Sequence, residues 1–337
     1  MSHADASVPV TRTACRARNP ATIAAMTRSR RLIHTTFLVL LPLAVAALGL
    51  SLATAAVIVA GALLWRWLIV FSGIVAPEKG PKVVLETISA SHFAEKVRWC
   101  MDRLGVEYTE HQSGGTLGVF FTGRTVPELR IRTGLVESVV GNSPEILRYL
   151  WGGYSAPLAD KAEFLRPTNE RLDLERKLDR YGANLQVWVY YHLLEDRALT
   201  LHAWGVDNPN VPAWHRLSLR LLFPLLAVLI RRAFRISDEN YAKSVLHIEE
   251  LLSNVDTRLA DGRQSILGGD EINYTDLAFA ALSGLWLQPP AYAGGKGDHS
   301  RIERSQIPAA MRTDVERWLE DYPKAAMLIE HLYAQER

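Results

Sequence analysis

The sequence predicts a small α/β domain followed by an all-helical domain, with a long apolar segment ahead of both. Three observations support this prediction. The segment Leu32–Val75 is almost free of charge, short apolar runs alternate with helical periods up to residue 151, and helical periodicity dominates from Lys161 onward. The expected parts are a disordered basic tail at 1–31, a membrane segment at 32–75, an α/β domain at 82–151 and a helical domain at 160–337.

The apolar segment is longer than one membrane span requires. Between Leu32 and Val75, only His34 and Arg66 have side chains that ionise near neutral pH. A single helix would measure about 65 Å at about 1.5 Å per residue, whereas the hydrocarbon core is about 30 Å thick. We therefore expect an N-terminal transmembrane helical hairpin, with helices at 32–50 and 54–74. A single tilted span with an apolar extension is the alternative.

Basic residues on both sides of this segment indicate its orientation. Residues 1–31 carry six arginines and one acid, Asp5, and Lys79 and Lys82 follow the segment. By the positive-inside rule, a hairpin places both flanks and the following domains in the cytoplasm, whereas a single span would export the domains. Two further interpretations of the tail are a transit peptide and a true start at Met26.

Charge and cysteine content exclude several classes of protein. Without the tail, the chain carries 32 basic and 35 acidic residues, so we expect no nucleic-acid-binding surface. Cys15 and Cys100 form neither a CxxC pair nor a metal-binding spacing, and we expect no metal. Cys100 is expected in the core, and this cysteine usage suits a reducing compartment.

Elements follow one another in the order β-α-β, then β-β-α, then helices. The expected strands cover 82–88, 106–112, 125–129 and 135–140, and the expected helices cover 93–104, 143–150, 161–202, 213–234, 238–260, 274–287 and 309–335.

Four short motifs occur in a recognisable order along these elements. Ser91–Trp99 (SHFAEKVRW), Thr125–Pro127 (TVP) and Asn142–Leu150 (NSPEILRYL) resemble the thioredoxin-like half of a glutathione S-transferase. Asn273–Phe279 (NYTDLAF) is similar to the capped helix in that family's helical half. The resemblance covers Lys82–Arg337. It implies an α/β thioredoxin-like domain followed by an all-α glutathione-transferase C-terminal domain.

Ser91 is the candidate catalytic residue. It stands between a strand and a helix N-terminus, where backbone N–H groups and the helix dipole favour an anion. A hydroxyl there would donate a hydrogen bond to a thiolate and lower the thiol pKa from about 8.5. The family uses Ser, Tyr or Cys here, and a serine disfavours thiol–disulfide exchange. The alternatives are that Ser91 only caps the helix, or that Ser89 takes the role.

The resemblance assigns glutathione binding to four further residues. Val126 and Pro127 match the family's cis-proline turn, which pairs with the cysteinyl backbone of glutathione; a trans proline is the alternative. Asn142 and Ser143 match the acid–Ser pair that holds the γ-glutamyl group. Because Asn replaces the acid, a charge that would pair with the ligand's ammonium is missing, and Asn142 is alternatively a plain helix cap. Glu137-Ser138 is a second candidate pair with an unsuitable spacing.

The remaining polar residues of the motifs are interpreted structurally. We expect His92 to be an exposed turn histidine; the alternative is that it tunes the thiolate or touches a substrate. Lys96 is expected to be a solvated helix charge and Arg98 a partner in an ion pair within the domain. Asn273 and Asp276 form a capping-box pattern.

Two apolar features of the helical half are also interpreted structurally. Leu221–Ile230, flanked by arginines, is a buried helix or a membrane-surface contact. The aromatic residues of 181–191 are assigned to the core and domain interface.

Together these features imply a membrane-anchored glutathione transferase. Its co-substrate would be glutathione, its second substrate a lipophilic electrophile, and its partners the lipid bilayer and a second copy in a homodimer. The alternative is a non-catalytic adaptor of the metaxin type that uses the same fold to bind protein partners at a membrane.

Overall fold

The computed structural model describes Gly49 and residues 52–75, 81–88, 90–112, 126–133, 136–269, 271–296 and 298–337. The expected tail at 1–31, the first expected membrane helix except Gly49, Ser89 and the Gly-rich segment at 113–125 lie outside these residues. The chain divides into two compact units, residues 1–77 and residues 78–337, and each is described by itself.

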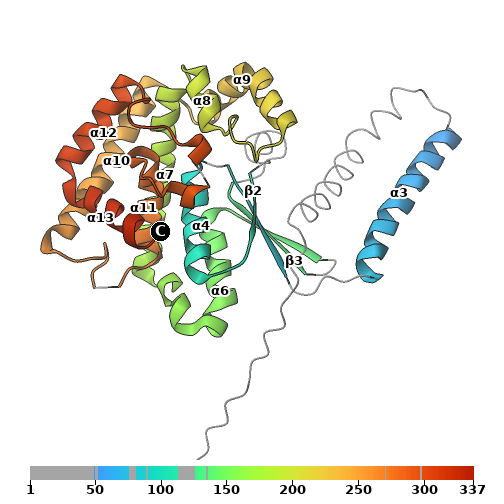
Figure 1. Ribbon diagram of the computed structural model, residues 1–337, viewed down its shortest axis with the longest axis horizontal. Coiled ribbons are helices and arrows are strands. Elements are labelled where there is room, and N and C mark those ends of the chain that lie inside the picture. Colours follow the sequence, from blue (N-terminus) through green and yellow to red (C-terminus); the bar gives the residue numbers. More distant parts are fainter. Residues whose placement is uncertain are drawn as a thin grey trace, which may run out of the picture. The chain divides into compact units, whose positions relative to one another are not determined.

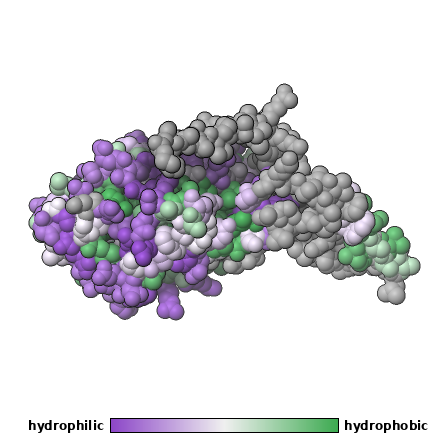
Figure 2. All heavy atoms as spheres, turned by 90° about the horizontal axis from the view of Figure 1, so that it is seen from below, coloured by the Kyte–Doolittle hydropathy of each residue, from purple (hydrophilic) through white to green (hydrophobic). Residues whose placement is uncertain are grey.

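The described helix of the first unit is α3 (Leu52–Val75), which agrees with the expected helix at 54–74. Its 24 residues correspond to about 36 Å of helix. Most of the side chains described along it are exposed, among them Val57 and Trp67, and they form a hydrophobic surface in Figure 2. By length and composition alone, α9 (Ala213–Ala233) of the second unit is long and apolar enough to cross a membrane.

The second unit begins with a four-stranded mixed sheet. Its strands are β1 (Lys82–Glu86), β2 (Thr109–His111), β3 (Glu128–Thr133) and β4 (Val136–Gly141), in the order β2-β1-β3-β4. β1 pairs parallel with β2 and antiparallel with β3, and β3 pairs antiparallel with β4. With α4 (His92–Leu104) after β1 and α6 (Ser143–Ala162) after β4, this is the predicted α/β arrangement (Figure 1).

The two faces of the sheet differ because side chains alternate along a strand. Leu85 of β1 lies opposite Leu129 of β3, and both are fully buried in the same core cluster as residues of α4 and α6. The next pair along, Glu86 and Glu128, lies on the other face with Arg130, whose guanidinium is 2.6 Å from the Glu128 carboxylate. The alternation therefore sends an apolar row to the helices and a charged row to the opposite side.

The rest of the unit is helical, as predicted. Its helices are α7 (Asn169–Leu193), α8 (Arg197–Ala203), α9, α10 (Asp238–Arg258), α11 (Tyr274–Leu287), α12 (Ala309–Asp321) and α13 (Pro323–Gln335), joined in part by the 3-10 turns η2 (Glu163–Leu165), η3 (Leu259–Asp261), η4 (Tyr292–Gly295) and η5 (Asp298–Ser300).

Two expected helices are interrupted. The one expected at 161–202 is broken before Pro167, because a residue preceding proline avoids the helical region, and α7 then starts at the cap Thr168. It is broken again at the cap Asp196, where α8 begins. The helix expected at 309–335 is likewise interrupted at Tyr322, whose φ of −127° and ψ of 56° precede Pro323.

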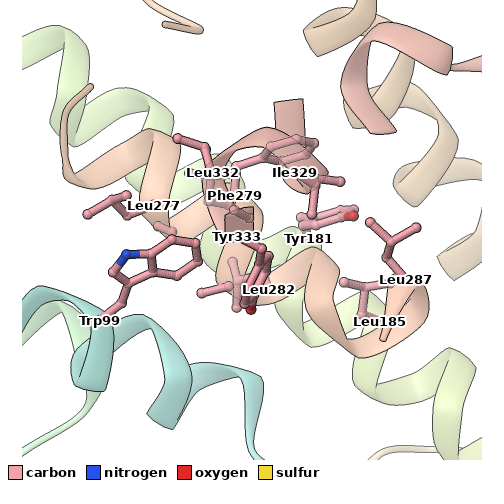
Figure 3. Close-up of a cluster of buried hydrophobic side chains, with 14 of the residues drawn as sticks. Trp99, Tyr181, Leu185, Leu277, Phe279, Leu282, Leu287, Ile329, Leu332 and Tyr333 are labelled. Atoms are coloured by element: carbon pink, nitrogen blue, oxygen red, sulfur yellow. The ribbon is translucent and has the colours of Figure 1, made fainter. Parts of the chain in front are cut away.

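One core joins the sheet-bearing part to the helices. Figure 3 shows Trp99 of α4 among side chains of α7, α11 and α13. Trp99 is 1% exposed, its indole N–H donates to the carbonyl of Glu336 over 2.8 Å, and its ring centroid lies 4.6 Å from that of Tyr333. α4, which carries the candidate site at its start, is therefore fixed in place by helices far along the chain.

Two expectations about charged residues are settled by this packing. Lys96 is fully buried, with its ammonium 3.3 Å from Glu175 and 3.1 Å from Asp179 of α7, so its assignment as a solvated charge is wrong. The expectation for Arg98 is confirmed, since its guanidinium donates to the Glu110 carboxylate over 2.9 and 2.7 Å. Lys96 lies on a face of α4 that looks polar in the sequence, but α7 packs against this face and encloses it. This packing explains why Lys96 was expected to be solvated.

The capping box is confirmed at the start of α11. The Asn273 side chain accepts from the N–H of Thr275, and the Asp276 carboxylate accepts from the N–H of Asn273 over 2.9 Å. Asp276 also accepts from the Ser265 hydroxyl and the Ile266 N–H, both over 2.8 Å. The motif therefore closes a buried turn and has a structural role.

Candidate functional site

Ser91 occupies the N-cap position of α4. Its hydroxyl oxygen accepts a hydrogen bond from the Ala94 N–H over 3.2 Å, and its own N–H donates to the Ile88 carbonyl over 3.0 Å. The expected capping role is therefore present. The cap uses a lone pair of the hydroxyl oxygen. The hydroxyl proton is left free for a ligand, because no acceptor for that proton is found among the described residues.

His92 is not the exposed turn residue expected from the sequence. It is 4% exposed, and its Nε2 lies 2.9 Å from the carbonyl oxygen of Gly182 on α7. Burial lowers the pKa of His92 to about 4, although the backbone hydrogen bond acts in the opposite direction. The ring is therefore neutral at pH 7, and it holds the start of α4 against α7.

The peptide bond between Val126 and Pro127 is cis, as predicted. This bond lies immediately before β3, and β3 is the neighbour of β1 in the sheet. Within the part of the chain described, neither the N–H nor the C=O of Val126 pairs with another backbone group. This backbone edge is available to an extended ligand.

Asn142 precedes α6 with a φ of 69° and a ψ of 136°, and its side chain makes no capping hydrogen bond. The plain capping role is therefore wrong. A non-glycine residue in this region costs about 1–3 kcal/mol, and such strain is concentrated at ligand sites. The following residue, Ser143, is fully buried, and its hydroxyl oxygen has no partner among the described residues.

The competing pair, Glu137-Ser138, lies within β4. The Glu137 carboxylate accepts from the Arg130 guanidinium over 2.8 Å, so it is engaged on the charged face of the sheet. The structure thus gives this pair a role in the sheet.

A cavity of about 420 Å³ brings several of these residues together. Ser91, Val126 and Asn142 line it from the sheet-bearing part, whereas Pro127 and Ser143 are not part of its lining. Much of the remaining wall comes from α7, α8, α9, α11 and the residues directly after α8 and α9. These side chains are mostly apolar and include Val189, Tyr190, Leu193, Ala203, Trp204, Ile230, Phe234, Leu285, Trp286 and Leu287.

The cavity also contains polar groups that sequence reasoning missed. The buried hydroxyl oxygen of Ser300 and the side-chain carbonyl oxygen of Gln288 have no partner among the described residues, and both residues line the cavity. Arg304 adds a cation from an exposed position. The positive φ of Gln288, 52°, marks the end of α11, which the sequence predicts at residue 287.

The aromatic residues of α7 divide between core and cavity. Tyr181 and Trp188 are buried in the main core, as predicted, and the Tyr181 hydroxyl bonds to Ser283 over 2.8 Å. Tyr190 instead lines the cavity, and Tyr191 stacks on Tyr241 with ring centroids 4.0 Å apart.

Comparison with known proteins yields likenesses among solved structures. No protein-family model matches the chain, and no curated protein matches it. A glutathione S-transferase from Methylobacterium radiotolerans, in complex with glutathione sulfonate, is similar over 75% of this chain and 91% of its own, at 17% identity and a TM-score of 0.44. FzlA from C. crescentus is similar over 76% and 89%, at 14% identity and a TM-score of 0.42.

A third likeness is to a maleylacetoacetate isomerase from Anaeromyxobacter dehalogenans with bound dicarboxyethyl glutathione and citrate. It covers 76% of this chain and 89% of that one, at 14% identity and a TM-score of 0.37.

Proposed function

We propose that the chain is a membrane-anchored glutathione transferase that joins the glutathione thiolate to a lipophilic electrophile. One observation carries the proposal: the Ser91 hydroxyl, the Val126 backbone before a cis proline and the strained Asn142 all line one largely apolar cavity. Such a cavity suits a substrate with a large apolar body and a few fixed polar contacts.

The thiol would be activated at the N-terminus of α4. The sulfur of glutathione loses its proton to solvent, and the thiolate accepts a hydrogen bond from the Ser91 hydroxyl near the positive end of the helix dipole. The sulfur then attacks an electrophilic carbon. A C–S bond forms, and the leaving group departs with the electron pair of the bond that breaks.

Two backbone sites would orient glutathione. The N–H and C=O of Val126, which pair with no other backbone group among the described residues, would pair with its cysteinyl residue as in an added strand. The N-terminus of α6 would hold the γ-glutamyl carboxylate through the N–H of Ser143 and its hydroxyl, which has no partner in the described part of the chain. Because the hydroxyl is buried, we expect a small rearrangement around Asn142 when glutathione binds.

The apolar segment would place this enzyme at a membrane. α3, with about 36 Å of helix and exposed apolar side chains such as Val57 and Leu63, is long enough for one pass. Two passes would leave the enzyme in the cytoplasm, where glutathione is abundant and reduced. Protease treatment of sealed vesicles of known orientation tests this. Cleavage of residues 82–337 from the face of the membrane opposite the cytoplasm would contradict it.

Binding and turnover test the chemistry. The full chain in detergent should be retained on immobilised glutathione and should conjugate glutathione to 1-chloro-2,4-dinitrobenzene. If the folded chain does neither, the enzyme proposal is wrong and the metaxin-type adaptor is favoured, a role with which the missing acid at Asn142 agrees.

A further inference from the structure

α9 has an apolar face whose large side chains are about half to two-thirds exposed. Eight large apolar side chains are exposed in the described part of residues 78–337, and five of them lie on this helix. These five are Trp214 (64%), Leu217 (55%), Leu221 (69%), Leu225 (49%) and Val228 (48%). We call them the α9 stripe. Spacings of three and four residues place them on one side of the helix.

The opposite side of α9 is fixed to the body. Leu219, Phe223, Leu226 and Ile230 are buried in a small core with residues of α8 and the following turn. α9 therefore cannot be both packed in this way and inserted across a bilayer, although its length and hydropathy would allow a span. The expectation of a buried helix is right for one face and wrong for the other.

The charges that α9 itself carries beside the stripe are all of one sign. Arg220 and Arg231 are eleven residues apart, which places them on one flank, and Arg232 follows in the last turn. α9 contains no acidic residue. Its flanking ion pairs are long and exposed, 3.9 Å from Arg220 to Asp207 and 3.6 Å from Arg231 to Glu195, so they hold these cations weakly.

We infer that the α9 stripe lies on the surface of an anionic lipid bilayer. An apolar face bordered by arginines is the pattern of an interfacial helix, whose side chains enter the headgroup region while its cations meet lipid phosphates. A second copy of the chain fits less well, because α9 against α9 would bring arginines together without an acid on either helix.

The contact would also define where substrate enters. Ile230, Ala233 and Phe234, at the end of α9, line the cavity that contains Ser91. A lipophilic electrophile dissolved in the bilayer would therefore reach the cavity beside the membrane contact. This consequence rests on the proposed function, whereas the contact itself does not.

Site-directed fluorescence on the full chain tests the contact. In a Cys15→Ser background, Leu221→Cys provides a single accessible thiol for an environment-sensitive dye, because Cys100 is buried. Leu246→Cys on α10 is the matched control, since Leu246 is exposed to a similar extent, 65%, outside the stripe. Both are reconstituted in phosphatidylcholine–phosphatidylglycerol vesicles that contain a quencher on the lipid acyl chains.

We expect the label at 221 to lose roughly half of its emission or more, and the label at 246 to remain unquenched. Each arginine replaced by glutamine at 220, 231 and 232 should lower the equilibrium constant for docking roughly fivefold. Equal, weak quenching at both positions would overturn the inference. Quenching between labelled copies in vesicles without the lipid quencher would assign the stripe to a second copy instead. Conjugation in detergent is measured without a bilayer, so the two proposals fail separately.

Discussion

The Nε2 of His92 lies 2.9 Å from the carbonyl oxygen of Gly182, although ninety positions separate the two residues. Because a carbonyl can only accept, the neutral ring carries its hydrogen on Nε2 and donates it. The residue that follows Ser91 is thereby tied to the middle of α7. The position of the proposed catalytic hydroxyl consequently depends on how closely α4 and α7 approach each other.

That approach requires glycine at position 182. A Cβ there would lie 2.7 Å from Cζ of Phe93 and 2.9 Å from Cδ2 of Leu282. Gly182→Ala should therefore destabilise the protein by about 1–3 kcal/mol through overpacking, measured by chemical unfolding in detergent. Gly152→Ala is the control, because no atom lies within 4 Å of its Cβ and alanine favours α6 by about 0.5–1 kcal/mol. Equal behaviour of the two variants would contradict the close approach.

Burial of His92 should make the protein sensitive to acid. The histidine pKa is about 6.5 when unfolded and about 4 when folded, so between these values the unfolded state binds more protons. Stability should consequently fall as the pH drops through this window, by about 3 kcal/mol in total. His92→Gln keeps a donor for Gly182 and should remove this part of the pH dependence in unfolding titrations. His247→Gln, at an exposed position of α10, is the control and should leave the pH dependence of stability as in wild type. If His92→Gln also leaves this dependence unchanged, His92 is not its source.

Local signals in the sequence were sufficient for much of this architecture. The cap at Ser91, the capping box at Asn273 and the helix boundaries around α9, α10 and α11 depend on residues within a few positions of each other, and the structure confirms them. The breaks before Pro167 and Pro323 also have a local signal, the prolines themselves, but the helical periodicity on both sides of each proline predicts a single helix.

Local signals in the sequence do not predict which polar residues are buried. His92 and Lys96 are enclosed by α7, about eighty to ninety positions away, and nothing near them in the sequence indicates that contact. The cavity poses the same difficulty, because Tyr190, Gln288 and Arg304 reach it from separate parts of the helical half. Contacts between distant parts of the chain therefore explain why His92 was expected to be exposed and why these cavity residues were not predicted.

Lys96 should be one of the most costly single positions to neutralise. Its ammonium is fully buried between Glu175 and Asp179, so Lys96→Met removes this cation from both carboxylates. Removing one partner of a buried pair costs about 3–5 kcal/mol, and we expect the lower end because Arg148 still binds Glu175 over 2.7 Å. Lys243→Met removes an exposed lysine 2.5 Å from Glu239 and should change the unfolding midpoint little. Similar midpoints for both variants would show that the Lys96 contacts contribute little.

An acid at position 142 should strengthen glutathione binding. Asn142 lines the cavity, and a carboxylate there would face the ammonium of the γ-glutamyl group under the proposed function. Since a partly exposed ion pair contributes up to about 1 kcal/mol, Asn142→Asp should lower the Kd by about twofold to fivefold in isothermal titration calorimetry. Asn142→Gly suits the positive φ but adds no charge, so it should not tighten binding through this interaction. An Asp variant that binds no more tightly than wild type would count against this subsite.

The two roles of Ser91 can be separated by three substitutions. Ser91→Ala removes both the helix cap, at about 1 kcal/mol of stability, and the hydroxyl proton. Ser91→Asn keeps a capping oxygen without a hydroxyl, and Ser91→Thr keeps both functions. If the hydroxyl stabilises the thiolate, Ala and Asn should shift the pH profile of kcat/KM upward toward the free thiol pKa of about 8.5, whereas Thr should largely retain the wild-type profile. Conjugation by Ser91→Ala as fast as wild type at neutral pH would leave Ser91 with its capping role alone, because an N-cap contributes to stability without touching the sulfur.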